Sequence, residues 1–187
     1  MRALLIALTA SSVLAACSST PPAAQSAPAA QPAQSTAQSA RANLASASGS
    51  LVSGQVAFAP MGNGVHISGT VGGLPPNSTH GIHVHEKGDC SAADASSAGG
   101  HFNPAASAHG RASAPAHHAG DMDNIVVNAD GVAQVNIHLM GVTLGGGAAN
   151  DIAGRALVVH AAPDDYTTQP SGNSGARVAC GVIVVAP

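Results

Sequence analysis

The chain has 187 residues, a length that as a prior corresponds to one domain able to bury its own core. Only 8% of the residues are charged, and the formal net charge of −3 at pH 7 provides no basic field, which argues against nucleic acid as a partner. Its 10 histidines, by contrast, are more than an ordinary domain of this size needs, so they are the feature that a function must explain.

Residues 1–16 have the features of an export signal. Arg2 gives a positive start, residues 3–13 form a short apolar segment, and small residues precede a cleavage site. The apolar segment is too short to remain as a membrane span. We therefore expect residues 1–16 to be absent from the mature protein.

The Leu-Ala-Ala-Cys sequence that ends at Cys17 resembles a bacterial lipobox, in which the cysteine becomes the lipidated first residue. This resemblance implies a periplasmic or cell-envelope protein tethered to a membrane through Cys17, and Ser18 after it favours the outer membrane. The alternative is an ordinary cleaved signal in which Cys17 lies by chance. Residues 17–40 are almost all Ala, Pro, Gln, Ser and Thr, without charge or apolar period, so we expect a disordered tether.

From about Arg41 onward, short alternating runs rich in Val, Ile and Thr are separated by Gly, Asn and Pro. Gly62-Asn63-Gly64 and Asp130-Gly131 lie between such runs, as hairpin turns would. The pattern predicts one all-β domain over residues 41–187. The expected strands are 41–47, 51–59, 64–73, 78–86, 123–129, 131–139, 154–160 and 177–185.

Two long stretches, residues 87–122 and 161–176, interrupt this strand pattern. A compact domain seldom carries loops of that length unless they are functional or disordered. A third stretch, residues 141–153, contains a run of three glycines, but without a following helix it is a poor phosphate site and we interpret it as a turn. The unusual chemistry of the chain is therefore expected in or beside the first two loops.

Two cysteines remain when Cys17 is set aside, namely Cys90 and Cys180. An even pair in an exported protein meets oxidising conditions in which a disulfide forms and persists. We expect Cys90 and Cys180 to be bonded to each other and to fix a long loop to the end of the chain.

Histidines and one aspartate form the candidate site. His83 and His85 are two residues apart in a strand-like run, so their imidazoles project from the same face. The following loop adds three histidines and Asp121, and three histidines with one carboxylate complete the four ligands of a closed Zn²⁺ site. The loop histidines are His101, His109 and His118, and His160 at the end of a later strand is a further candidate.

In order and spacing these motifs resemble the copper/zinc superoxide dismutase family over about residues 41–187. The motifs are His83-Val84-His85-Glu86, Gly88-Asp89-Cys90, Gly99-Gly100-His101-Phe102-Asn103-Pro104, His109-Gly110, His118-Ala119-Gly120-Asp121, His160 and the run from Gly172 to Ile183. The resemblance implies an eight-stranded Greek-key β-sandwich or flattened barrel with two long functional loops. It also implies an enzyme that disproportionates superoxide into dioxygen and hydrogen peroxide, with copper cycling between Cu(II) and Cu(I) and zinc structural.

The resemblance further assigns roles to individual residues. It makes His83, His85, His101 and His160 the copper ligands, and His101, His109, His118 and Asp121 the zinc ligands, with His101 shared. Asp164 matches a carboxylate that links a copper histidine to a zinc histidine, and Arg177 matches an arginine that holds the anion beside copper. His101 would also carry a proton to the nascent peroxide.

Four histidines match no ligand position of the family and are interpreted as surface or hydrogen-bonded residues: His66, His80, His117 and His138. The loop 161–176 also departs from many family members, because it contains Asp164 and Asp165 but no lysine. We therefore expect weak electrostatic steering of superoxide.

Other functions remain in competition. A non-catalytic periplasmic protein that binds or buffers copper and zinc would need the ligands but not Arg177, and a copper-only dismutase would lack zinc ligands. A purely structural β-sandwich would leave the ordered ligands unexplained. The sequence leaves the oligomeric state open, a homodimer included.

Overall fold

A computed structural model describes residues 33–187 of the chain, and all structural statements concern this part. The segment is all-β apart from one short 3-10 helix, η1, at Ser96–Ala98. The strands are β1 (Ala40–Ser46), β2 (Ser53–Met61), β3 (Gly64–Gly72), β4 (Thr79–His80), β5 (Ile82–His85), β6 (Ile125–Val126), β7 (Val132–Met140), β8 (Ala156–His160), β9 (Arg177–Val182) and β10 (Val184–Val185). None of the described helices is long and apolar enough to cross a membrane.

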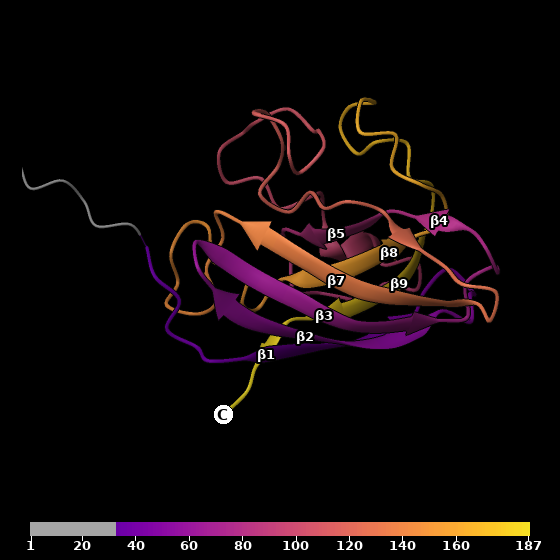
Figure 1. The fold of residues 1–187 in the computed structure, drawn as a ribbon, viewed down its shortest axis with the longest axis horizontal. Coiled ribbons are helices and arrows are strands. Elements are labelled where there is room, and N and C mark those ends of the chain that lie inside the picture. Colours follow the sequence, from indigo (N-terminus) through magenta and orange to yellow (C-terminus); the bar gives the residue numbers. More distant parts are fainter. Residues whose placement is uncertain (1–32) are drawn as a thin grey trace, which may run out of the picture. The chain divides into compact units, whose positions relative to one another are not determined.

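The strands form one curled antiparallel sheet in the order β5-β8-β9-β1-β2-β3-β7, with β10 beside β1, and a small second sheet of β4 and β6. β1 joins the two halves, because its first residues pair with β2 whereas Ala45 and Ser46 pair with β9. Strands β1, β2, β3 and β7 make one layer and β5, β8 and β9 the other (Figure 1). Because β7 returns beside β3 and β8 beside β5, the connections are of the Greek-key kind, as predicted.

The alternation of side chains explains why the sheet curls around an apolar core. Along β3, Val65, Ile67 and Val71 are buried, while the residues between them point outward. The same period on β2 buries Val56 and Phe58. Inward residues of both layers form one continuous hydrophobic cluster, which fixes the sheet as a rigid support for the loops.

The predicted strands lie where the alternating pattern placed them, with three changes. Of the run 123–129, only Ile125–Val126 forms a strand, β6. The run 78–86 is split into β4 and β5 at Gly81, whose N–H donates to the carbonyl of Ala162 rather than to a strand partner. The run 177–185 is split at Ile183, whose N–H donates to Arg155. Both predicted hairpin turns join consecutive strands.

The predicted signal peptide, Cys17 and most of the tether lie outside the described residues. The last part of the expected tether differs from the prediction, because residues before Arg41 already contact the domain. The N–H groups of Thr36 and Ala37 both donate to the carbonyl of Leu144, and Ala40 is a buried residue of β1. Backbone hydrogen bonding therefore extends the ordered structure a few residues upstream of position 41.

Two long loops rise from one edge of the domain, next to β4 and β5 (Figure 1). They are the predicted stretches 87–122 and 161–176, and they enclose the end of the sheet where His83, His85 and His160 lie.

Candidate metal centre

Three histidines of the site are carried by neighbouring strands. β5 pairs with β8 in a register that places His83 opposite Val158 and His85 opposite Ala156. At the far end of β8 the register shifts between Val159 and His160. The result brings His85 Nε2 to 3.3 Å from His160 Nε2 and the ring centroids of His83 and His160 to 4.9 Å, with all three side chains buried.

His101 reaches this group because its segment pairs with β5 outside the regular sheet. The N–H of Phe102 donates to the carbonyl of Val84, and His101 forms an isolated bridge with His85. The ring centroids of His83 and His101 are then 4.0 Å apart. A loop residue thus joins a strand-built cluster through ordinary backbone hydrogen bonds.

Two sets of four residues each bring one ligand atom per residue within 4.8 Å of the others, and His101 belongs to both. One set is His83, His85, His101 and His160; the other is His101, His109, His118 and Asp121. All seven predicted ligands are buried in the structure. The two spatial groups therefore contain the same residues as the two ligand sets that the resemblance implies.

Asp121 is the anionic centre of the second set. Its Oδ1 lies 2.8 Å from His101 Nδ1 and 3.3 Å from His118 Nδ1, while Oδ2 accepts hydrogen bonds from the backbone N–H groups of Gly110 and His118 at 3.1 and 2.8 Å. Burial alone would raise the pKa of Asp121, but these hydrogen bonds outweigh it and hold the pKa well below the usual range. The carboxylate stays ionised, as a cation site needs.

Within the described part of the chain, four imidazole nitrogens of the centre are buried without a hydrogen-bond partner: His83 Nδ1, His101 Nε2, His109 Nδ1 and His118 Nδ1. His109 Nδ1 is 3.0 Å from Asp121 Oδ2, but that geometry does not make a hydrogen bond. Leaving a buried polar atom unpaired costs about 1–3 kcal/mol. All four atoms belong to the two sets, so the residues present fit metal ions as their missing partners.

Burial keeps His83, His85 and His160 in the neutral form that binds metals. Desolvation lowers the pKa of His83 to about 4, although the Asp164 carboxylate opposes the shift. Desolvation, with repulsion from neighbouring histidines, lowers the pKa of His160 to about 3 and that of His85 well below its ordinary value. At neutral pH these three imidazoles are therefore uncharged.

Asp164 links the two sets by contacting one histidine of each. Its buried carboxylate lies 2.8 Å from His83 Nε2 and 3.0 Å from His109 Nε2, so one group orients a histidine of each set. Gly172 closes over it: a Cβ there would overlap Asp164 Oδ1, and its φ of +65° also favours glycine. The position predicted for this carboxylate is the one in the structure.

Three residues that the sequence analysis did not select also hold the site. The side-chain amide of Asn124 bonds both backbone groups of Asp164, at 2.8 and 2.9 Å. The side-chain amide of Gln169 does the same to His109, at 2.8 and 2.9 Å. His80, interpreted as surface or hydrogen-bonded, is buried, and its Nδ1 lies 2.8 Å from the carbonyl oxygen of His160.

Arg177 is half-buried beside the first set. Its guanidinium donates to the carbonyls of Ala95 and Gly99 at 2.6 Å each, and the Gly99 carbonyl also lies 3.0 Å from His85 Nδ1. One carbonyl thus fixes both the guanidinium and a histidine of the set. The predicted disulfide between Cys90 and Cys180 is present, and it joins the loop that carries these carbonyls to β9.

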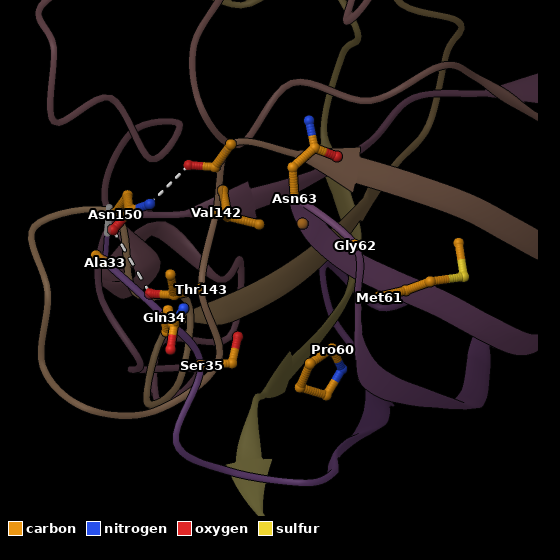
Figure 2. Close-up of a pocket in the computed structure, with 12 residues that line it drawn as sticks. Ala33, Gln34, Ser35, Pro60, Met61, Gly62, Asn63, Val142, Thr143 and Asn150 are labelled. Atoms are coloured by element: carbon orange, nitrogen blue, oxygen red, sulfur yellow. Dashed lines mark hydrogen bonds between the residues drawn. The ribbon is translucent and has the colours of Figure 1, made fainter. Parts of the chain in front are cut away.

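A separate hollow lies at the β2–β3 hairpin (Figure 2). It is lined by Ala33, Gln34, Ser35, Pro60, Met61, Gly62, Asn63, Gly64, Gly141, Val142, Thr143 and Asn150. None of these residues is a histidine, cysteine or acid, so the hollow offers no acid–base group and none of the ligands found in the metal centre.

Comparison with known proteins agrees with the geometry. The family model for copper/zinc superoxide dismutase matches residues 52–183. Superoxide dismutase [Cu-Zn] 2 of Aquifex aeolicus is 42% identical over 135 residues, which are 71% of this chain and 79% of the relative. Superoxide dismutase [Cu-Zn] of Caulobacter vibrioides is 43% identical over 136 residues, covering 70% and 78% of the two chains.

Solved structures show the same fold. A superoxide dismutase-like protein from Bacillus subtilis superposes with a TM-score of 0.70 at 36% identity, covering 77% of this chain and 97% of the other. The clock protein EA4 superposes with a TM-score of 0.73 at 34% identity, covering 82% and 98%.

Proposed function

The chain belongs to the copper/zinc superoxide dismutase family, and from this premise we propose which residues bind each metal, which attract the substrate and which carry the proton. The protein is a superoxide dismutase that converts superoxide into dioxygen and hydrogen peroxide with copper and zinc as cofactors. The observation that carries the assignment of residues is the pair of buried four-residue sets that share His101.

We assign copper to the set of His83, His85, His101 and His160, and zinc to the set of His101, His109, His118 and Asp121. The chemistry of the donors supports this division, because the all-imidazole set suits copper and the set with a carboxylate suits the harder, redox-inactive zinc. Bound copper supplies the one-electron redox change that the reaction requires, and zinc supplies a fixed positive charge.

Arg177 attracts and orients the substrate. Its guanidinium stays charged at any physiological pH, and the carbonyls of Ala95 and Gly99 hold it beside the first set. Superoxide is a monoanion, so a fixed cation at the entrance favours its approach. The two carbonyls use one terminal nitrogen each, and the remaining N–H donors can bind the anion.

His101 is the proposed proton carrier. Its Nδ1 faces Asp121, whereas its buried Nε2 has no hydrogen-bond partner among residues 33–187, and His101 is also a member of the first set. A proton held at Nε2 would lie at the side where peroxide forms, and the Asp121 carboxylate fixes the ring in that orientation.

The decisive experiment measures superoxide decay by the copper- and zinc-loaded protein, with His160→Ala as the control. Catalysis predicts fast decay that His160→Ala abolishes. A non-catalytic metal-buffering protein, the alternative function, predicts the slow spontaneous decay in both samples. Arg177→Ala separates the two further, because a buffer does not need that residue.

We also propose that residues 1–16 are removed and that Cys17 carries a lipid that tethers the enzyme in the cell envelope, with the outer membrane favoured. The lipobox-like sequence supports this, and the Ala, Pro, Gln, Ser and Thr composition after Cys17 is typical of a tether up to the residues that contact the domain. Mass spectrometry of the mature N-terminus tests the lipid, and Cys17→Ser should release the protein from membranes. A homodimer stays a prediction for analytical ultracentrifugation.

A further inference from the structure

Two of the four histidines outside the metal centre lie side by side on the solvent-facing side of the layer formed by β1, β2, β3 and β7. β3 and β7 pair in a register that places His66 directly opposite His138. On β3 the buried residues are Val65 and Ile67, so His66 between them points outward, and on β7 the burial of Leu139 leaves His138 outward and exposed. Directly opposed residues of antiparallel strands have Cβ atoms about 4.5–5.5 Å apart, so the two imidazoles can bind one ion.

Two exposed methionines occupy the next row of the same face. Met140 follows His138 by two residues on β7, and Met61 stands at the end of β2; their exposed fractions are 54% and 48%. Both are paired with Gly64, which has no side chain to separate them. Figure 2 shows the Met61 thioether extending away from the side chains that line the neighbouring hollow.

Within residues 33–187, no charged side chain surrounds these four donors, and the Met140 thioether has one polar neighbour, the exposed Asn63 side-chain amide at 4.0 Å, which a bound ion would displace. The β2 partner of His66 is Ala59, so the two rows contain only His66, His138, Met61, Met140 and two small residues. The outward positions of β2, β3 and β7 carry no Asp, Glu, Lys or Arg. A soft ion would meet no repelling ammonium there, and a hard ion such as Ca²⁺ or Mg²⁺ would find no carboxylate to bind.

From this arrangement we propose a surface site for a cuprous ion, made by His66, His138, Met61 and Met140 and called the β3–β7 patch. Thioethers select Cu(I) over harder ions, and imidazole is a good ligand for copper. The patch lies on strands at the far end of the sheet order from β5 and β8, so it is distinct from the metal centre. It would hold copper outside the catalytic set, and it requires no assumption about the reaction.

Silver ion is the first probe, because it is soft like Cu(I) and does not change its redox state. Titrating Ag⁺ into the copper- and zinc-loaded full chain carrying Cys17→Ser, which removes the competing thiol, with copper kept as Cu(I), should shift the methyl NMR signals of Met61 and Met140 and saturate at one added ion per chain. Met122, which is 1% exposed and follows the ligand Asp121, is the internal control and should not move. Silver that moved only the Met122 signal would lie in the metal centre and would overturn the proposal.

Competition with a chromophoric Cu(I) chelator then measures the affinity for the additional ion. The double variant His66→Gln with His138→Gln should lower it by about tenfold or more, equal to about 1.4 kcal/mol. Asn136→Ala, which changes an outward residue of β7 outside the patch, should leave it unchanged. Superoxide dismutase activity should be the same in all three proteins, which shows that the variants fold. Equal binding of the extra ion by the double variant would overturn the proposal.

Discussion

The two halves of the metal centre are built in different ways. His83, His85 and His160 stand on β5 and β8, where strand register and complete burial fix them. His109, His118 and Asp121 lie in a loop, where hydrogen bonds to a carboxylate and to side-chain amides fix them. The comparison shows that strand register places the histidines of the first half, with one loop contact each to His83 and His85, whereas the second half depends on loop hydrogen bonds throughout.

Acid should destabilise the strand-borne half of the centre, namely His83, His85 and His160, more than the loop-borne half, namely His109, His118 and Asp121. Burial lowers the pKa of His83 to about 4 and of His160 to about 3, so between pH 6.5 and these values the unfolded chain binds protons that the folded chain excludes. The metal-free protein should therefore lose stability as the pH falls below about 6.5, by up to about 1.4 kcal/mol per pH unit for each histidine. Urea unfolding at a series of pH values, with metals chelated, measures this slope.

The matched variants are His83→Gln and His160→Gln, each of which should flatten the slope. Asp121 and Asp164 also lose their contribution to stability on acidification, but at lower pH. Their pKa values are lowered, so the contribution persists down to about pH 4 and is lost only below it. A stability that stays constant between pH 7 and pH 5 would contradict the account of the strand-borne half.

Removing the disulfide should be the next largest effect. The Cys90–Cys180 bond closes a loop of 90 residues and ties the first long loop to β9. Cys90→Ala with Cys180→Ala should lower the free energy of unfolding by about 4 kcal/mol on the chain-entropy estimate. Denaturant unfolding of the metal-free variant and of the oxidised and reduced parent measures it. A change of less than about 1 kcal/mol would mean that the loop needs no tie to the sheet.

Asp121→Asn should disable the loop-borne half selectively. The change removes the negative charge but keeps the size of the side chain, and zinc should bind about 100-fold more weakly because a charged ligand is lost. Asp123→Asn in the same loop is the control, since Asp123 is exposed and pairs only with Arg111. Competition with a zinc chelator gives the affinities, and copper uptake should change much less. Equal loss of both metals would show that the halves are not independent.

Gln169→Ala should produce the smallest of these effects. It deletes two neutral hydrogen bonds to the backbone of His109, worth about 1 kcal/mol each, so zinc dissociation should accelerate by up to about thirtyfold. Gln134→Ala on β7 makes the same substitution in an outward position and should have no effect. Zinc release followed with a fluorescent chelator provides the readout. If the two variants release zinc at the same rate, Gln169 does not position His109.

Much of this molecule could be predicted from its sequence because two signals are strong, the alternation of apolar residues in the strands and the order of the histidine motifs. Alternation predicted β3 and β7 almost to the residue, and the resemblance of the ordered histidine motifs to the copper/zinc superoxide dismutase family implied both four-residue sets. The burial of His80 was also within reach, because His80 is in phase with the buried residues Ile82 and Val84. Because His80 matches no ligand position of the family, the sequence analysis interprets it as surface or hydrogen-bonded without using this phase.

Other contacts could not be predicted by the same means. Gln169 and Asn124 act on backbone groups 60 and 40 residues away, and an amide side chain in a loop has no periodicity that would select it. The attachment of Thr36 and Ala37 to Leu144 was missed for a similar reason, since composition describes the tether but not where its last residues meet the sheet.

The central claim is that two ions share the ring of His101. Anomalous diffraction from crystals of the copper- and zinc-loaded protein kept in the Cu(II) state, in which His101 Nε2 carries no proton, tests it most directly when it is collected at both absorption edges. The account predicts a copper peak among His83, His85, His101 and His160 and a zinc peak among His101, His109, His118 and Asp121, each about 2.0–2.1 Å from a different nitrogen of His101. A single peak, or two peaks of which only one contacts His101, would contradict it.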